Sequence, residues 1–160
     1  MKTAIIYTSK HGTTEKIAHA IADKIRDTSD VEVFSLKKNP NPNIGEFDTV
    51  ILGSSIYAGQ TSKKMKAFCK ENESVLLQKK LGLFICGMHT NKEEIDKEMK
   101  VSYSEALQEK SVVHEFLGGE FLFEKMSFFE RFAARMIAKT KVSVHRIDWD
   151  GIDNFVKKLR

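Results

Sequence analysis

Apolar residues in this chain follow two patterns, short continuous runs and positions spaced three or four residues apart. The continuous runs and alternating segments predict strands at residues 3–8, 31–35, 49–53, 81–86 and 111–117. The helical spacing predicts helices at about residues 14–27, 62–73, 92–109 and 149–159. Strands and helices therefore alternate along the sequence.

This alternation predicts an α/β fold. Near-continuous apolar strands such as residues 49–53 are typical of a parallel sheet that helices cover on both sides. We expect a doubly wound five-stranded parallel sheet with helices on both faces, formed by residues 1–160 as a single domain. Residues 39–43 contain Pro40 and Pro42 and should be neither helix nor strand.

An extra helical segment is expected between the fifth strand and the last helix. About 30 residues, roughly 118–147, separate them, which is longer than a usual connection. Near residues 127–139 the apolar positions recur at helical spacing: Phe128, Phe129, Phe132, Ala133, Met136 and Ile137. This face could pack on the sheet as an ordinary covering helix. Alternatively, it could form a lid or a docking surface for a large apolar substrate, a quinone or a membrane.

Ligands of doubly wound sheets bind at the carboxyl ends of the strands, so the loops that follow the first, third and fourth strands are the candidate site. The first loop is rich in hydroxyls and leads into a helix N-terminus, where unpaired backbone N–H groups favour an anion such as a phosphate. The other two carry small residues and one or two large ones, which suits a flat ring attached to that phosphate. The candidate residues are Thr8, Ser9, Lys10, His11, Gly12, Thr13, Thr14, Ser54, Ser55, Ile56, Tyr57, Ala58, Gly59, Gly87, Met88 and His89.

Charge and composition limit the kinds of partner that we expect. The net charge of +4 indicates an anionic partner, but basic and acidic residues are intermixed, so we do not expect nucleic acid binding. Only two cysteines occur, Cys69 and Cys86, which fits a reduced cytoplasmic setting. The sequence has no apolar run of the roughly 20 residues that a membrane span needs, and no signal peptide is expected. Peripheral membrane contact stays open.

The residues that several other functions require are missing from this sequence. A phospho-receiver domain needs a carboxylate after the third strand, where this chain has Gly53 and Ser54. A dinucleotide fold needs a Gly-x-Gly-x-x-Gly loop, and the first loop has Gly12 alone. No cluster of histidines, cysteines or carboxylates has metal-ligand spacing, so no metal is expected.

The chain resembles the flavodoxin-fold proteins that bind FMN. Ser9, Gly12 and Thr14 match the hydroxyl-rich phosphate loop of that family, whereas Lys10 and His11 depart from it. Residues 52–59, the segment from Phe128 to Ile137 and the Asp148-Trp149 pair are similar to the subgroup that includes menaquinone-dependent protoporphyrinogen oxidase.

This resemblance implies FMN as the cofactor and a redox function. The first possibility is an oxidoreductase acting on a quinone or a porphyrinogen, and the second is an electron carrier between redox proteins. It also suggests roles within the site. Tyr57 would stack on the flavin unless it is an ordinary surface tyrosine. Lys10 would be a counter-charge to the phosphate or a solvated loop charge, and His11 and His89 are expected to be loop residues rather than catalysts.

Overall fold

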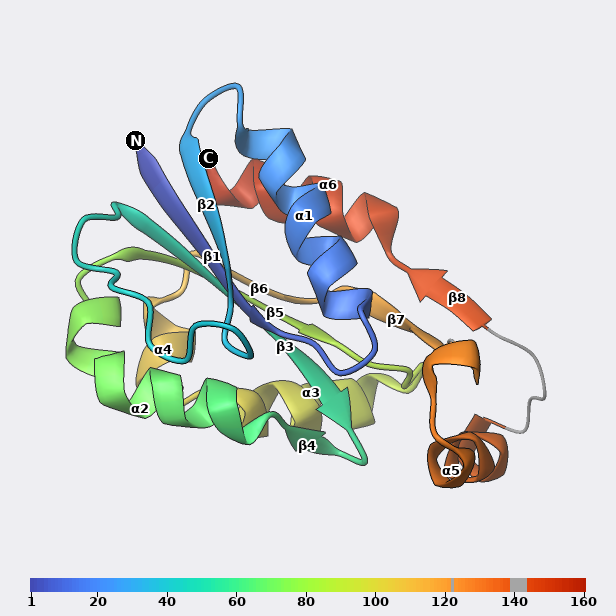
Figure 1. Ribbon diagram of the computed structural model, residues 1–160. Coiled ribbons are helices and arrows are strands. Elements are labelled where there is room, and N and C mark those ends of the chain that lie inside the picture. Colours follow the sequence, from blue (N-terminus) through green and yellow to red (C-terminus); the bar gives the residue numbers. More distant parts are fainter. Residues whose placement is uncertain (122, 139–143) are drawn as a thin grey trace.

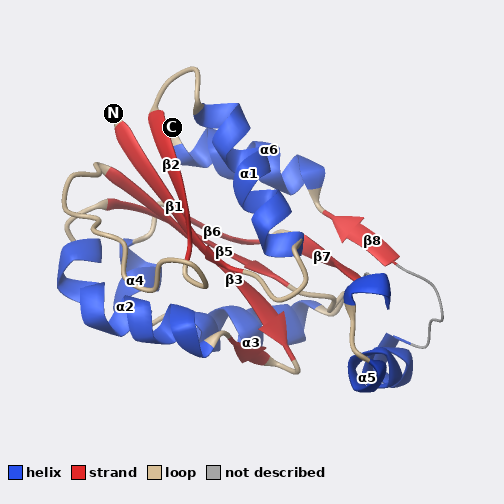
Figure 2. Ribbon diagram, in the orientation of Figure 1, coloured by secondary structure: helices blue, strands red, loops and turns tan. Residues whose placement is uncertain are grey.

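The computed structural model describes residues 1–121, 123–138 and 144–160 (Figures 1 and 2). The strands are β1 (Lys2–Thr8), β2 (Asp30–Ser35), β3 (Thr49–Tyr57), β4 (Gln60–Thr61), β5 (Lys80–Cys86), β6 (Val113–Phe116), β7 (Gly118–Phe121) and β8 (Val144–Ile147). The α-helices are α1 (Thr13–Ile25), α2 (Lys63–Leu76), α3 (Lys92–Ser102), α4 (Glu105–Lys110), α5 (Phe128–Ala138) and α6 (Trp149–Leu159). A short 3₁₀ turn, η1 (Phe123–Lys125), precedes α5.

Five parallel strands form the central sheet in the order β2-β1-β3-β5-β6, as the sequence predicts. The chain moves outward from β1 to β2 and then returns to the other side of β1 with β3. The loops after β1 and β3 therefore leave the sheet side by side at a topological switch point.

Helices cover both faces of this sheet (Figure 1). Successive side chains of a strand point to opposite faces. Ala4 and Ile6 of β1 accordingly belong to the core that α2, α3 and α4 cover, whereas Ile5 and Tyr7 belong to the core under α1 and α6. Both cores are apolar and together they fix the strand ends that carry the loops.

Close packing in the sheet requires glycine at residue 53. A side-chain carbon on Gly53 would lie 2.1 Å from the ring of Phe84 on the neighbouring strand β5. Only a hydrogen fits there, so the ring of Phe84 lies against the backbone of β3. Phe84 in turn packs edge-to-face against Phe155 of α6.

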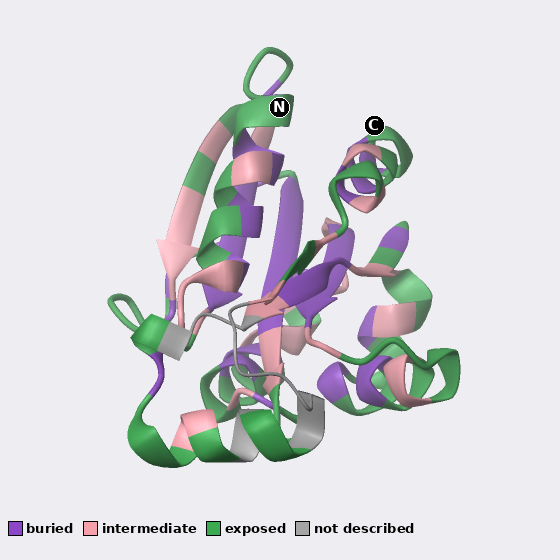
Figure 3. Ribbon diagram, turned by 90° about the vertical axis from the view of Figure 1, so that its right-hand side faces the viewer, coloured by how far each residue is buried: buried purple, intermediate pink, exposed green. Residues whose placement is uncertain are grey.

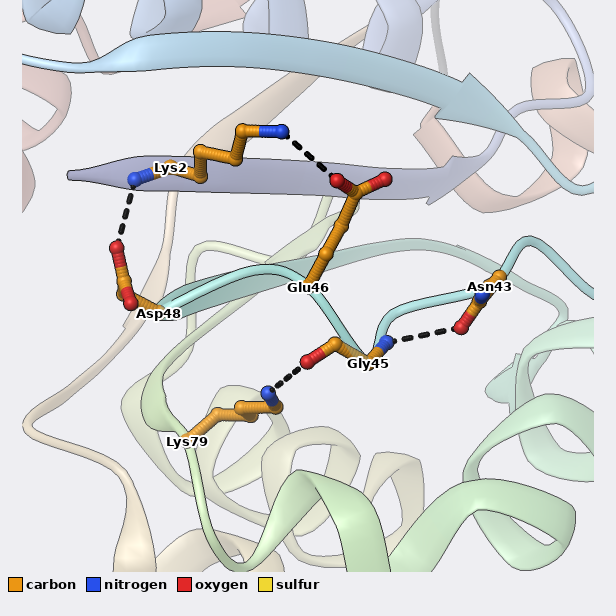
Figure 4. Close-up of polar contacts among 6 residues, drawn as sticks. All are labelled: Lys2, Asn43, Gly45, Glu46, Asp48 and Lys79. Atoms are coloured by element: carbon orange, nitrogen blue, oxygen red, sulfur yellow. Dashed lines mark hydrogen bonds and ion pairs between the residues drawn. The ribbon is translucent and has the colours of Figure 1, made fainter.

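The irregular segment after β2 is fastened at the opposite end of the sheet from the switch point (Figure 4). The backbone N–H of Lys2 donates to Asp48 at 2.8 Å, and its ammonium pairs with Glu46 at 2.7 Å. The Lys79 ammonium donates to the carbonyl of Gly45 at 2.7 Å. The two prolines lie in turns and irregular backbone, as predicted.

The expected helix at residues 92–109 is wrong in one respect, because the structure divides it into α3 and α4. Tyr103 between them is extended, and its buried hydroxyl donates to the carbonyls of Leu52 and Phe84. Ser104 then caps α4. The single hydroxyl proton is shared between these two sheet carbonyls, and this buried contact is made where the chain leaves the helical conformation. The strand expected at 111–117 is also shorter and forms only β6.

Residues between β6 and α6 form a separate layer that we call the insert (residues 117–148). It contains α5, as the sequence predicts, and also an antiparallel pair of strands, β7 and β8, that the sequence did not indicate. In Figure 1 the insert lies beyond the switch-point end of the sheet. It therefore stands beside the candidate loops.

Helix α5 turns large apolar side chains to solvent (Figure 3). Phe128, Phe129, Phe132 and Met136 are 80%, 82%, 61% and 69% exposed. The expectation that this face packs on the sheet is therefore wrong for these four side chains. Ala133, Ile137 and Lys139 lie outside the described side chains.

Candidate cofactor site

The loop between β1 and α1 is built around Gly12. Its φ of 96° is a left-handed conformation that favours glycine, and its backbone N–H donates to the hydroxyl of Ser9 at 2.9 Å. Gly12 occupies the N-cap position and has no side chain to cap α1. The first N–H groups of α1 are thus available to an anion.

Thr14 supplies a hydroxyl that suits the same anion. The residue is fully buried, and among the described residues its Oγ1 has no hydrogen-bond partner. A buried hydroxyl without a partner is costly unless a ligand satisfies it. Thr14 lies in the first turn of α1 and not in the exposed part of the loop before it.

Thr8 and Ser54 lie in the strands β1 and β3, below the loops that carry most of the other candidates. Both are buried, and their hydroxyl oxygens lie 3.2 Å apart across β1 and β3. This bond ties the two strand ends together just below the loops. Ser54 and Ser55, expected in a loop, still belong to β3 and pair with Ile85 and Cys86.

A cavity lies where the loops after β1, β3 and β5 meet, and it encloses about 500 Å³ when the open space at its mouth is counted. Ten of the candidates line it: Ser9, Lys10, His11, Thr13, Thr14, Ser55, Ile56, Tyr57, Gly87 and Met88. Thr8, Gly12, Ser54, Ala58, Gly59 and His89 do not line it. Sequence reasoning missed four further lining residues, Cys86, Gly119, Glu120 and Met126. The unusual length of the insert was the only signal for the last three.

The end of β3 turns back in a tight hairpin to β4. Ala58 and Gly59 form its two-residue turn, and both have positive φ, 50° and 71°. Type I′ turns require this conformation at both central positions. The turn leaves Tyr57 41% exposed at the rim of the cavity.

The insert closes one side of the cavity. The N–H of Gly87 donates to the carbonyl of Gly118 at 3.0 Å, and a side chain on Gly119 would lie 2.4 Å from the carbonyl oxygen of Gly87. This close crossing requires glycine at residue 119. It brings Glu120 to the cavity wall, where it pairs with Lys16 at 3.1 Å.

Glu120 is ionised within this wall. Burial alone would raise the pKa of its carboxyl, but hydrogen bonds from His145 and Lys16 outweigh burial and lower the pKa. Lys16 holds α1 to the insert through this carboxylate, and His145 of β8 contacts the same carboxylate oxygen from within the insert.

A second carboxylate of the insert reaches the first loop. Glu130 of α5 forms an ion pair with Lys10, and its other oxygen lies 3.5 Å from Nε2 of His11. The hydrogen bond from Lys10 and the backbone N–H of Ser127 lower the pKa of Glu130 to about 2. Lys125 also approaches this loop, with its ammonium 3.4 Å from where a side-chain carbon on Gly12 would lie.

Behind the third loop lies a buried carboxylate, Glu98. Its Oε1 lies 3.3 Å from Nε2 of His89, and neither carboxylate oxygen has a hydrogen-bond partner among the described residues. Burial raises the pKa of Glu98, and His89 opposes that effect. Glu98 thus lies directly behind the cavity wall at Gly87.

Both cysteines are free and buried. Burial raises the pKa of Cys69 and of Cys86 to about 12. Cys86 borders the cavity, but its thiol stays protonated at neutral pH and is a poor nucleophile.

The sequence profile of the flavodoxin domain matches residues 4–148. The chain belongs to the flavodoxin domain family. FMN is accordingly its cofactor. The cavity fits such a group, because the uncapped start of α1 and the unpartnered Thr14 hydroxyl can receive a phosphate.

Two curated proteins are similar to this flavodoxin-domain chain in sequence. Protoporphyrinogen IX dehydrogenase [quinone] of Escherichia coli (strain K12) is 21% identical over 171 residues, covering 99% of this chain and 94% of that protein. A flavodoxin of Clostridium saccharobutylicum is 31% identical over 84 residues, about half of each chain (51% and 52%).

Solved flavodoxins share the fold. A short-chain flavodoxin associated with a bacterial microcompartment has a TM-score of 0.64 at 14% identity, covering 99% of this chain and 96% of that one. Flavodoxin 2 from Bacillus cereus has a TM-score of 0.59 at 16% identity, covering 99% and 97%. In the described parts of this chain, no helix is both long and apolar enough to cross a bilayer.

Proposed function

We propose that this flavodoxin-domain protein is an FMN-dependent oxidoreductase similar to the quinone-linked protoporphyrinogen oxidases. The observation that carries the proposal is the insert, which lines the cofactor cavity with Gly119, Glu120 and Met126 and presents an exposed aromatic helix beside it. A second support is the similarity along nearly the whole chain to protoporphyrinogen IX dehydrogenase.

The first loop would bind the phosphate of FMN. Backbone N–H groups at the start of α1, the hydroxyls of Ser9, Thr13 and Thr14, and the ammonium of Lys10 surround the proposed position. Gly12 lets the backbone approach closely because it has no side chain.

The other two loops would flank the flavin ring. Ile56 and Tyr57 would form one wall, and Gly87 and Met88 the other. Bound FMN would supply the two-electron redox chemistry, by which the donor would be oxidised and a quinone reduced to the quinol. The residues of the chain orient the ring and exclude water from it. We place this reaction in the cytoplasm, in keeping with two free thiols.

Helix α5 would meet the apolar partner. Phe128, Phe129 and Phe132 form an exposed apolar face next to basic Arg131 and Arg135 on the same helix. Such a face suits a quinone or the surface of the membrane in which quinones dissolve, through peripheral contact only.

The alternative function is that of an electron carrier between redox proteins. The flavodoxin similarity favours it. The net charge of +4 counts against it, because flavodoxin carriers are generally acidic around the flavin, although net charge affects only the rate of encounter with a partner.

Anaerobic reduction tests the main proposal. FMN-loaded protein is mixed with protoporphyrinogen IX without oxygen, and the visible flavin absorbance is followed. We expect the absorbance to bleach and to return when a water-soluble menaquinone analogue is added. No bleaching by the porphyrinogen would contradict the proposal.

A reductive titration separates the two functions. An oxidoreductase of this kind should pass to the fully reduced flavin without an accumulated one-electron form. A carrier should accumulate the one-electron form at its midpoint. Absorbance spectra recorded during stepwise dithionite addition distinguish the two outcomes.

A further inference from the structure

A second cavity adjoins the cofactor cavity on the side of β4 and α2. It encloses about 1060 Å³ including its opening. Ser9, Lys10, Ser55 and Tyr57 line both cavities, so a ligand in the second one would lie next to the cofactor.

The lining of this second cavity is strongly basic. Lys10, Lys37, Lys63 and Lys64 border it, and no aspartate or glutamate is among its described lining residues. Lys10 already pairs with Glu130. The other three form no ion pair with any residue that the structure describes. Three uncompensated ammonium groups around one hollow attract an anion.

Two of these lysines stand where a helix disfavours them. Lys63 and Lys64 are the first two residues of α2, whose first turn contains no acidic residue. The N-terminal end of a helix carries a partial positive charge, so cations there are destabilising. Ser62 makes no capping hydrogen bond that would offset this. The positive charge therefore does not serve the stability of α2, and it is concentrated at the cavity.

We infer that this second cavity, here called the lysine cavity, binds the carboxylates of an organic polyanion whose apolar body reaches towards Tyr57. The inference rests on the proposed function, because it identifies the ligand as the electron donor of that reaction. A porphyrinogen fits this class, since it combines a large apolar macrocycle with carboxylate side chains. Exposed ammonium groups on long side chains suit carboxylates of variable position.

The test compares two double variants that change net charge equally on the same helix. Lys63→Gln with Lys64→Gln removes half of the lysines of the lysine cavity. Lys66→Gln with Lys70→Gln is the control, because these exposed lysines of α2 lie outside both cavities. The probe is protoporphyrin IX, with its dimethyl ester as a neutral analogue, and binding to the FMN-loaded protein is followed by the porphyrin absorbance.

We expect the cavity variant to bind protoporphyrin IX roughly tenfold more weakly than wild type, in keeping with the modest strength of exposed ion pairs. The control variant should bind like wild type, and the ester should not discriminate among the three proteins. The melting temperature of the cavity variant should be unchanged or higher, because cations leave the start of α2. Equal binding of protoporphyrin IX to all three proteins would overturn the inference that the lysine cavity binds its carboxylates.

The experiments distinguish a failure of the inference about the lysine cavity from a failure of the proposed function. If porphyrinogen is oxidised and the cavity variant keeps the wild-type KM, the proposed function stands and the inference falls. If porphyrinogen is not oxidised, mellitate serves as a redox-inert polycarboxylate probe. Thermal stabilisation by mellitate in wild type and control, but not in the cavity variant, would then support the lysine cavity alone. Equal stabilisation of all three would overturn it.

Discussion

The ammonium group of Lys10 lies 3.5 Å from the centre of the Tyr57 ring, in cation–π geometry. The same ammonium pairs with Glu130 of α5. One side chain of the first loop thus connects the end of β3 with the insert. A phosphate bound by this loop would share Lys10 with the Glu130 carboxylate.

Replacing Glu130 by glutamine should therefore tighten FMN binding. Glu130 is ionised at neutral pH because its pKa is about 2, and it repels the cofactor phosphate. Glutamine keeps the reciprocal hydrogen bonds with Ser127 that begin α5. We expect FMN affinity to rise about threefold to tenfold by fluorescence titration, the size of a modest charge interaction.

Riboflavin, which lacks the phosphate, is the control ligand for that variant. Its affinity should not change in Glu130→Gln. Glu115→Gln serves as the control protein, since Glu115 pairs with Lys158 and lines neither cavity. Weaker FMN binding in Glu130→Gln would mean that Glu130 helps the cofactor site rather than competing with it.

Replacing Thr14 by valine should weaken FMN binding without unfolding the protein. Valine has nearly the same shape and removes a buried hydroxyl that has no partner in the described structure. Loss of a hydrogen bond to a charged phosphate should cost about tenfold or more in FMN affinity. Calorimetric titration gives the affinity, and circular dichroism should show an unchanged or higher melting temperature for the cofactor-free protein.

Thr49→Val is the matched control for that change, because Thr49 is also buried but lies at the other end of β3. Its FMN affinity should equal that of wild type. An unchanged affinity in Thr14→Val would remove Thr14 from the phosphate site.

Replacing Gly53 by alanine should destabilise the fold. The added methyl group would overlap the Phe84 ring, and overpacking of this kind costs about 1–3 kcal/mol or more. The free energy of unfolding from urea denaturation measures the loss. Gly45→Ala is the control, because its added carbon would meet only Asn43, at 3.2 Å, in an exposed loop. Equal stability of the two variants would contradict the close packing of Phe84 on β3.

Replacing Glu98 by glutamine should stabilise the protein at alkaline pH. Because burial raises the pKa of Glu98, its stabilising contribution is complete below the ordinary value of 4.5 and is lost as the pH rises through the raised pKa. Glutamine has no charge to bury. We expect a melting temperature about 2–4 °C higher near pH 8, corresponding to about 1 kcal/mol, and no difference near pH 4. A variant less stable near pH 8 would indicate that the His89 pair outweighs burial.

The sequence was sufficient to predict the central sheet and the loops that follow the carboxyl ends of its strands. β1, β3 and β5 each carry an apolar run, and the sequence from β1 through Gly12 into α1 has the pattern of a strand, a hydroxyl-rich loop and a helix. These features are local, because neighbouring residues determine them.

The features that sequence reasoning missed depend on distant contacts. The hydroxyl of Tyr103 bonds two sheet carbonyls and interrupts a helix whose local pattern is continuous. The strand β7 begins with Gly118 and Gly119, which have low strand propensity. A side chain on Gly119 would collide with the backbone of Gly87, and one on Gly118 would collide with the carbonyl of Arg146 on β8. Periodicity showed that α5 has an apolar face but not whether that face is covered. The pairing of Lys10 with Glu130 also has no local sequence signal.

Titration of the cofactor-free protein with FMN, followed by quenching of flavin fluorescence and compared with riboflavin, tests the central claim most directly. The account predicts saturable, stoichiometric binding of FMN that is much tighter than that of riboflavin, because the start of α1 holds the phosphate. Failure to bind FMN, or equal affinity for the two flavins, would contradict the phosphate site on which the account depends.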